Sequence, residues 1–413
     1  MRRIAMVLLA SVSMPAFGQS VGHVHNSSCN HQWSDNQGEL SVGGLDADIE
    51  QYSLSNATLP GMTFILNNLG GVGAGSDALR GFQAAAAMWS RILKDPVTIR
   101  LDVRFAQLAP NVLGSTGSTT NTVNYTGLAL LLAADSKSVW DASAVATLQA
   151  GPALAFVSNE PPTAGAIDSR TRFLDNNGTF DNNNIQINTA QVKALGLNPI
   201  YASSNTSLRD GTVSFSNQFV WDFDPTDGIT AGSIDFVGVA AHEIGHALGF
   251  RSGVDLADNN ALPGRAGPGG ARGLNNIAWG TVQDLYRYGA FNGEKTLDWS
   301  IGGSPCYSIN GGANCIAPLS TGSFNGDRRQ ASHWKDDTLL GGLPIGIMDP
   351  TASGPGGTRP LMKISKFDRL AFDVMGYDLA VPEPGTWMML IAGFGLVGAT
   401  MRRRRAVEIA QIG

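Results

Sequence analysis

The most informative stretch of the sequence is His242-Glu243-Ile244-Gly245-His246, which lies within VGVAAHEIGHALGF (237–250). Two histidines four residues apart on a helix lie one turn apart on the same face, so both rings can reach one metal ion. Glu243 points to the side, where it can hold a metal-bound water rather than the metal itself. The apolar flanks predict that this helix is buried.

The N-terminal end reads as a targeting segment. Residues 1–18 combine Arg2 and Arg3 with an apolar run and small residues before Gln19, which is the pattern of a secretory signal peptide. Residues 19–40 are predicted to form a flexible leader, rich in histidine around Cys29. A second interpretation stays open, in which this leader is a short inhibitory pro-segment whose Cys29 thiolate blocks the metal.

The C-terminal segment 381–413 contains a second predicted targeting signal. Pro382-Glu383-Pro384 precedes the uncharged run 385–401, which is just long enough as a helix to cross a thin bilayer, and Arg402–Arg405 follow on the cytoplasmic side. This order resembles the PEP-CTERM sorting signal of Gram-negative bacteria. The resemblance implies recognition by exosortase-type sorting machinery at the inner membrane and delivery to the cell surface or extracellular matrix, released or transiently anchored. A plain C-terminal anchor is the alternative.

Composition excludes one class of partner. The chain has 28 basic and 34 acidic residues; leaving out the six terminal arginines and the two glutamates of the tail leaves 22 and 32. An acidic, exported body without a basic patch argues against nucleic acid. Cys306 and Cys315 flank a short loop containing glycines, and an oxidising compartment favours a disulfide between them.

Residues 41–380 are predicted to form one catalytic domain, with an N-terminal subdomain of about 41–250 and a C-terminal subdomain of about 251–380. A helix is expected after Ser76 and a half-buried strand over 97–105. The motif helix is expected to start near residue 236, capped by Asp235, and to end at Gly249. Further helices are expected within 281–290 and 364–379, and Arg287 in the first of them is interpreted as structural.

A third metal ligand must come from elsewhere, because catalytic zinc usually takes three protein ligands and a water. The compact spacing HExxHxxGxxH would place it at Ser252, which is a poor zinc ligand. Outside the leader, His333 is the remaining histidine of the domain. Asp255 stays open as the alternative, through its carboxylate. Glu294 does not lie in a helical pattern, which argues against a thermolysin-like arrangement.

His333 is followed by Trp334 and, fifteen residues later, by Met348. This layout resembles the leishmanolysin-like metzincins, a group of zinc metallopeptidases in which an insertion separates the HExxH helix from a distant third histidine. The resemblance implies that His242, His246 and His333 bind Zn²⁺, and that Met348 is the Met-turn residue beneath the metal. The resemblance covers about residues 242–350.

The sequence therefore predicts an α+β, metzincin-like fold: a mixed sheet with helices in the N-terminal subdomain, an active-site helix carrying HExxH, and a loop-rich C-terminal subdomain with a Met-turn. The expected function is that of a secreted, surface-sorted zinc endopeptidase acting on proteins or peptides, with a zinc-activated water and Glu243 as general base. Two alternatives stay open: a non-catalytic matrix or surface structural protein on a metallopeptidase scaffold, and zinc-dependent hydrolysis of a non-peptide bond.

Overall fold

The computed structural model describes residues 21–26, 51–54, 61–162, 167, 171–201, 208–261, 273–342, 344–352 and 362–380. The chain divides into two compact units, Met1–Asp378 and Leu379–Gly413. The expected signal peptide, Cys29 and the tail from residue 381 with its apolar run lie outside the described residues. Among the residues that are described, no helix is long and apolar enough to cross a membrane.

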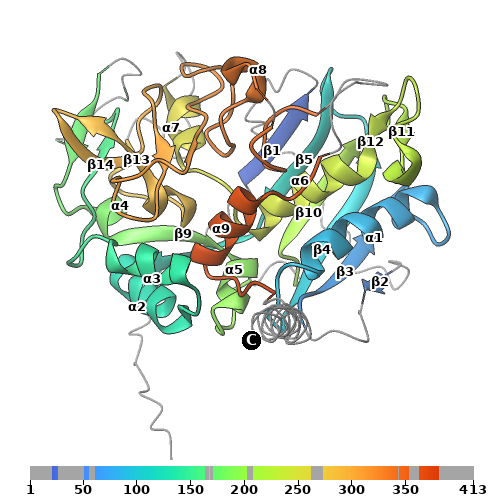
Figure 1. The fold of residues 1–413 in the computed structure, drawn as a ribbon, viewed down its shortest axis with the longest axis horizontal. Coiled ribbons are helices and arrows are strands. Elements are labelled where there is room, and N and C mark those ends of the chain that lie inside the picture. Colours follow the sequence, from blue (N-terminus) through green and yellow to red (C-terminus); the bar gives the residue numbers. More distant parts are fainter. Residues whose placement is uncertain are drawn as a thin grey trace, which may run out of the picture. The chain divides into compact units, whose positions relative to one another are not determined.

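A six-stranded mixed sheet occupies one part of the first unit (Figure 1). Three neighbouring strands, β10, β4 and β3, run parallel to one another, and the other pairs of neighbouring strands are antiparallel. In order across the sheet the strands are β1 (Val21–Asn26), β5 (Val112–Ser118), β10 (Gly211–Ser216), β4 (Thr98–Ala106), β3 (Thr63–Asn68) and β2 (Gln51–Leu54). The predicted mixed sheet is thus present, and β4 is the strand expected over 97–105.

Two helices, α1 (Asp77–Ser90) and α6 (Phe236–Leu248), lie side by side against this sheet (Figure 1). Phe236, the first residue of α6, packs its ring 5.0 Å from that of Phe82 on α1 and 4.5 Å from that of Phe215 on β10. The indole nitrogen of Trp89 donates to the carbonyl of Ala241 at 2.8 Å. These contacts fix the start and the middle of α6, and every residue of α6 is buried, as its apolar flanks predict.

A second six-stranded sheet combines late and early segments of the chain. In order its strands are β16 (Ala317–Pro318), β15 (Cys306–Tyr307), β13 (Arg287–Phe291), β14 (Glu294–Asp298), β7 (Phe156–Ser158) and β8 (Phe173–Asp175). Strands β7 and β8 precede residue 250, so the expected division into subdomains at that position is wrong for this sheet. The reason is topological: β7 pairs in parallel with β14, which follows it by more than a hundred residues.

Two small sheets and several short helices complete the first unit. The sheets pair β6 (Thr120–Asn124) with β9 (Asn184–Asn188) and β11 (Trp221–Asp222) with β12 (Ile234–Asp235). The helices are α2 (Tyr125–Asp135), α3 (Val139–Ala146), α4 (Phe180–Asn183), α5 (Thr189–Ala194), α7 (Val254–Asn260), α8 (Asp337–Leu340) and α9 (Lys366–Val374), with 3-10 turns η1 (Pro225–Asp227) and η3 (Gln283–Tyr286). Helix α9 confirms the helix expected within 364–379.

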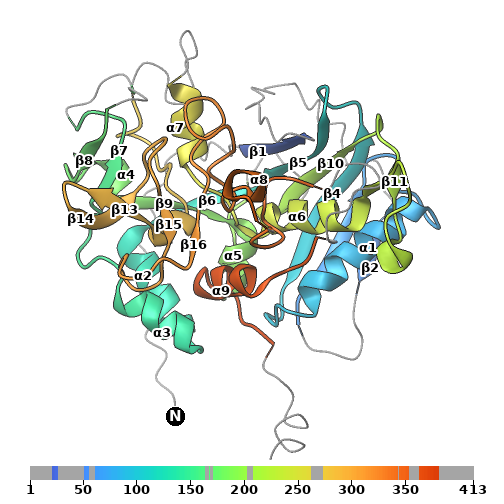
Figure 2. The same cartoon turned by 45° about the horizontal axis from the view of Figure 1, so that its top comes forward.

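Two local predictions need correction. The segment 281–290 is not one helix: η3 covers its first part, and β13 begins at Arg287. Arg287 is fully buried and its guanidinium donates to the carbonyl oxygens of Asp298 at 2.9 Å and Ser320 at 2.7 Å, so its structural role is confirmed. The leader is also not flexible throughout, because its residues Val21–Asn26 form the strand β1, which pairs with β5 (Figure 2). Pairing with β1 satisfies backbone N–H and C=O groups along that edge of β5.

Candidate metal centre

Helix α6 presents the two motif histidines because both of its ends are fixed. Asp235 caps the helix by accepting the backbone N–H of Gly238 at 2.8 Å. Gly249 ends it with φ of +121°, and a Cβ there would lie 2.4 Å from the side-chain amide carbon of Gln191. Both ends are those predicted from the sequence, and only glycine satisfies the second.

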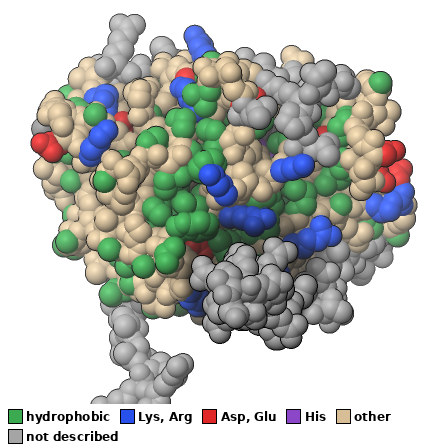
Figure 3. Space-filling model, viewed as in Figure 1, with side chains coloured by type: hydrophobic (Ala, Val, Ile, Leu, Met, Phe, Trp, Pro, Cys, Tyr) green, Lys and Arg blue, Asp and Glu red, His purple; other side chains and the backbone are tan. Residues whose placement is uncertain are grey.

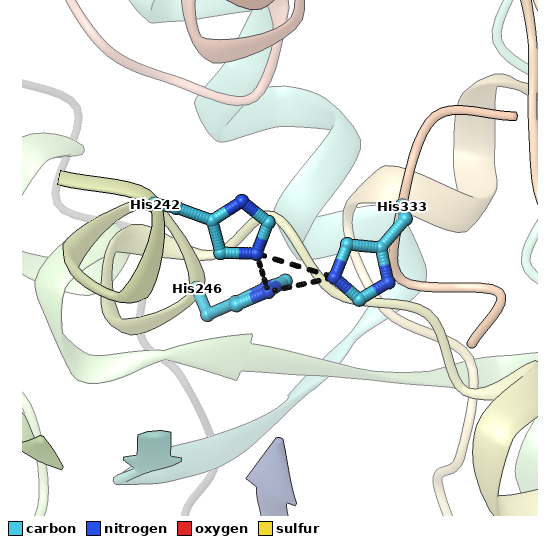
Figure 4. Close-up of side chains that lie close together, drawn as sticks. All are labelled: His242, His246 and His333. Atoms are coloured by element: carbon cyan, nitrogen blue, oxygen red, sulfur yellow. Dashed lines mark hydrogen bonds between the residues drawn. The ribbon is translucent and has the colours of Figure 1, made fainter. Parts of the chain in front are cut away.

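Three histidine rings meet at the C-terminal half of α6 (Figure 4). The Nε2 atoms of His242 and His246 lie 2.9 Å apart, and each lies 3.2 Å from Nε2 of His333. All three residues are at most 1% exposed, so they add almost nothing to the molecular surface, of which Figure 3 draws one face. The structure thus brings together the three histidines that the sequence singled out, although His333 lies 87 positions after His246 in the chain.

The outer nitrogen of each ring faces a backbone carbonyl. Nδ1 of His242 lies 2.6 Å from the oxygen of Ile347, and Nδ1 of His246 lies 2.7 Å from the oxygen of Phe250. Nδ1 of His333 lies 3.3 Å from the oxygen of Gln330. A carbonyl oxygen only accepts, so each Nδ1 carries the proton and each Nε2 directs a lone pair to the centre. Burial lowers the pKa of His242 to about 4, which keeps that ring neutral.

Three converging lone pairs fit a bound cation. Zinc–imidazole bonds of about 2.0–2.1 Å at tetrahedral angles place the ligand nitrogens roughly 3.3–3.4 Å apart, close to the 2.9 and 3.2 Å separations observed here. Backbone carbonyls behind the rings fix their orientation, as acceptors bonded to the outer ring nitrogen do in zinc sites. An all-imidazole donor set suits zinc better than calcium or magnesium, which prefer oxygen. The residues present therefore fit zinc.

Glu243 lies between α6 and β5. Its Oε2 accepts the hydroxyl of Thr116 at 2.5 Å, and a Cβ on Gly114 would lie 2.8 Å from its Oε1. Glycine at 114 therefore makes the room in which this carboxyl sits. Burial raises the pKa of Glu243 to about 8, and the hydrogen bond from Thr116 opposes that rise. A cation held by the neighbouring histidines would favour the charged carboxylate and lower this pKa.

Asp255 lies outside the histidine group, which corrects its place as the alternative third ligand. Its carboxylate accepts the backbone N–H groups of Ala331 at 2.7 Å and Ser332 at 3.1 Å, and also the hydroxyl of Ser332. These donors immediately precede His333 in the chain. Asp255 therefore positions the loop that carries His333, and its oxygen atoms are already engaged there.

Ser252, where the compact metzincin spacing would place a histidine, is also engaged in the scaffold. Its hydroxyl donates to Oδ1 of Asp284 at 2.6 Å, and its backbone N–H donates to the hydroxyl of Ser332 at 2.8 Å. Asp284 accepts in addition the N–H groups of Gly253 and Thr281. The segment after α6 is thus tied to the His333 loop and to the turn that leads into η3.

Met348 lies under α6, fully buried. A Cβ on Gly245 would lie 2.4 Å from its sulfur, so glycine at this helix position lets the methionine approach between the two motif histidines. The carbonyl of Met348 accepts the N–H of Trp334, which ties this segment to the residue after His333. Met348 thus packs its buried side chain closely against α6.

Asp368 on α9 is a positioning residue that sequence reasoning missed. It accepts the N–H of Ile347 at 2.8 Å on Oδ2 and the indole N–H of Trp334 at 2.8 Å on Oδ1. It also completes a capping box with Ser365 at the start of α9. The capping box is a local pattern that can be predicted from the sequence. The two distant donors to Asp368, from Trp334 and Ile347, cannot be predicted in this way.

The described residues contain a second group of potential ligands, Asp336, Asp337 and Asp349. Asp336 pairs with Arg329, and Asp349 accepts the N–H of Asp337 at 3.1 Å. Thr351 donates its hydroxyl to Asp349 at 3.0 Å. These bonds fold the segment that follows Met348 against the start of α8, which is a structural role.

A small pocket opens beside His242. It is lined by Leu113 of β5, Val239 and His242 of α6, and the later residues Asp349, Ala352 and Met362. Apart from the histidine and the aspartate, the lining is apolar. The pocket lies between β5 of the first sheet and the segment that follows Met348.

The predicted disulfide between Cys306 and Cys315 is present, with Cα atoms 5.5 Å apart. It closes the loop between β15 and β16 in the second sheet. Neither cysteine contributes a ligand atom to the histidine group.

Comparison with known proteins identifies the C-terminal segment. Residues 380–405 match the PEP-CTERM protein-sorting motif. This motif points to export and surface sorting in a Gram-negative bacterium and implies recognition by exosortase-type sorting machinery. No curated protein and no solved structure matches the chain.

Proposed function

We propose that the chain is a surface-sorted zinc endopeptidase, in which His242, His246 and His333 bind zinc and Glu243 is the general base. The observation that carries the proposal is the convergence of three Nε2 lone pairs beside a buried glutamate. A structural zinc site has no use for a general base, whereas hydrolysis requires one. The sorting motif agrees with action outside the inner membrane.

The residues divide the chemistry between them. Zinc supplies Lewis acidity, which polarises a carbonyl and lowers the pKa of water. Glu243 takes the proton of the attacking water and delivers it to the departing amine. Thr116 holds one carboxyl oxygen of Glu243, and Gly114 leaves space beside the other. The carboxyl is thus oriented before any substrate arrives.

The resemblance to leishmanolysin-like metzincins supports this assignment. An HExxH helix against a mixed sheet, a histidine from a distant loop and Met348 beneath the helix are the parts that this resemblance calls for. We therefore interpret the segment around Met348 as a Met-turn. The pocket lined by Leu113, Val239 and Met362 has room for about one water molecule beside His242.

A second candidate is a non-catalytic surface protein in which zinc only stabilises the fold. One observation favours it: the histidines and Glu243 are at most 1% exposed, as in closed structural sites. The two candidates differ in what Glu243 does, because a structural site does not depend on its carboxylate.

Cleavage of a diverse peptide library by zinc-loaded residues 19–380 tests the proposal, with Glu243→Gln as the matched variant. Glutamine keeps the shape and the hydrogen bond from Thr116 but cannot accept a proton as a base. We expect cleavage by the wild type, a loss of at least about a thousandfold in the variant, and equal zinc content in both. Equal cleavage by both proteins, or none by the zinc-bound wild type, would favour the structural candidate.

A further inference from the structure

Strand β1 occupies the outer edge of β5, the strand closest to the metal centre. Val21 pairs with Ser118 and Val24 with Ser115, antiparallel, while the other edge of β5 pairs with β10. Figures 1 and 2 both show β1 running alongside β5. The chain's own N-terminal segment thus fills an edge that would otherwise offer free N–H and C=O groups.

This edge passes directly beside the site. Leu113 of β5 lines the pocket next to His242, Gly114 abuts the carboxyl of Glu243, and Thr116 donates to that carboxyl. A chain that pairs with residues 113–116 of β5 therefore runs past both the pocket and the general base. An extended peptide that adds to this edge would present its backbone at the metal centre.

The pairing of β1 changes register at this same place. Val24 opposes Ser115 and Asn26 opposes Val112, so the single residue between them in β1 faces both Leu113 and Gly114. This is a β-bulge in β5, a feature that re-aims side chains and is common next to active sites. Strand β1 therefore pairs along the whole of β5, including the residues next to Glu243 and the pocket.

We propose that β1 is an inhibitory strand that holds the substrate edge of β5 until it is displaced or removed. The inference rests on the proposed peptidase function. Only one strand can pair with a given edge, so β1 and a peptide substrate exclude each other. If the signal peptide is cut before Gln19, the exported chain starts two residues before β1 and carries the inhibitor with it.

The tether sets the expected strength of inhibition. Residues 27–50 connect β1 to β2, and linkers of this order give an effective concentration of about 1 mM. If β1 binds the edge of β5 with a dissociation constant of about 100 μM, this effective concentration keeps the edge occupied about ten times as often as not. Loss of β1 pairing should raise kcat/KM about tenfold.

The test uses the zinc-loaded chain 19–380 with His23→Pro and Val24→Pro together. Neighbouring residues of an antiparallel strand point their N–H groups in opposite directions, so one of these two prolines removes a bond to β5. The matched control is His23→Thr with Val24→Thr, which retains both N–H groups and a strand-favouring side chain. Two quantities are measured: kcat/KM on a cleaved library peptide, and binding of the synthetic peptide QSVGHVHN by fluorescence anisotropy.

We expect the proline variant to cleave about ten times faster than the wild type and the threonine control, and it alone to bind the added peptide, which also inhibits it competitively. Equal kcat/KM in all three proteins, without peptide binding, would overturn the inhibitory strand and leave the peptidase intact. If the proline variant binds the peptide but none of the zinc-loaded proteins cleaves, the proposed function fails, and inhibition with it, although β1 is shown to be exchangeable.

Discussion

Replacing Asp255 with asparagine should loosen the loop that carries His333 without removing a zinc ligand. The carboxylate accepts three donors, from the backbones of Ala331 and Ser332 and from the hydroxyl of Ser332. Burial raises the pKa of Asp255 to about 7, so the group is a carboxylate above that pH. Hydrogen bonds to a charged group contribute about 1.5–3 kcal/mol each, and an amide can keep at most part of them because its NH₂ group faces a donor. Losing the equivalent of two should lower the free energy of unfolding by about 3–6 kcal/mol.

Zinc affinity should fall by a smaller factor than in a ligand variant. Removal of a group that orients a metal ligand typically lowers metal affinity about 10–100-fold, and we expect that range for Asp255→Asn. His333→Ala removes a nitrogen ligand and should lose more. Competition with a chromophoric chelator measures both affinities. Asp298→Asn serves as the control, since Asp298 is also buried and accepts the guanidinium of Arg172.

Two outcomes would refute this reasoning. If folded Asp255→Asn loses as much zinc affinity as His333→Ala, Asp255 acts as a ligand and the loop argument is wrong. If Asp255→Asn binds zinc as tightly as the wild type and the Asp298→Asn control, the three hydrogen bonds do not position His333.

Two further predictions concern stability. Gly245→Ala should lower the free energy of unfolding in urea by about 1–3 kcal/mol, because the added methyl group would overlap the sulfur of Met348. The control is Gly127→Ala on α2, where a Cβ meets no atom within 4 Å, and it should raise the free energy of unfolding by up to about 1 kcal/mol. Equal effects of the two substitutions would disprove the close approach of Met348 to Gly245. Burial raises the pKa of Asp95 to about 7. Between about pH 4 and pH 7 the folded state therefore keeps a proton that the unfolded state releases, and the free energy of unfolding falls as the pH rises through this range. Asp95→Asn should therefore gain on the order of 2 kcal/mol relative to the wild type between pH 5 and pH 7, and a pH-independent difference in melting temperature would contradict the assignment.

The parts of the site that sequence predicts are those fixed by local chemistry. The ends of α6 follow from Asp235 and Gly249, because capping and positive φ depend on neighbouring residues. His333 could be singled out because few histidines remain in the domain once the leader is set aside. Met348 followed from the same layout.

The parts that sequence did not predict depend on distant partners. Asp255 has the chemistry of a ligand, and only the fold places the donors of Ala331 and Ser332 around it. Strand β1 is short, and its pairing partner begins 86 residues later, at Val112, so no periodicity within the leader reveals it. The pairing of β7 with β14, which joins segments on both sides of residue 250 in one sheet, could not be predicted for the same reason.

The most direct test of the central claim is zinc K-edge X-ray absorption on the zinc-loaded chain 19–380, compared with His333→Ala at the same metal content. The account predicts one zinc per chain with three imidazole nitrogens at about 2.0–2.1 Å in the wild type and two in the variant. An imidazole count that is the same in both proteins, or a wild-type site dominated by oxygen ligands, would contradict the convergence of His242, His246 and His333 on one ion.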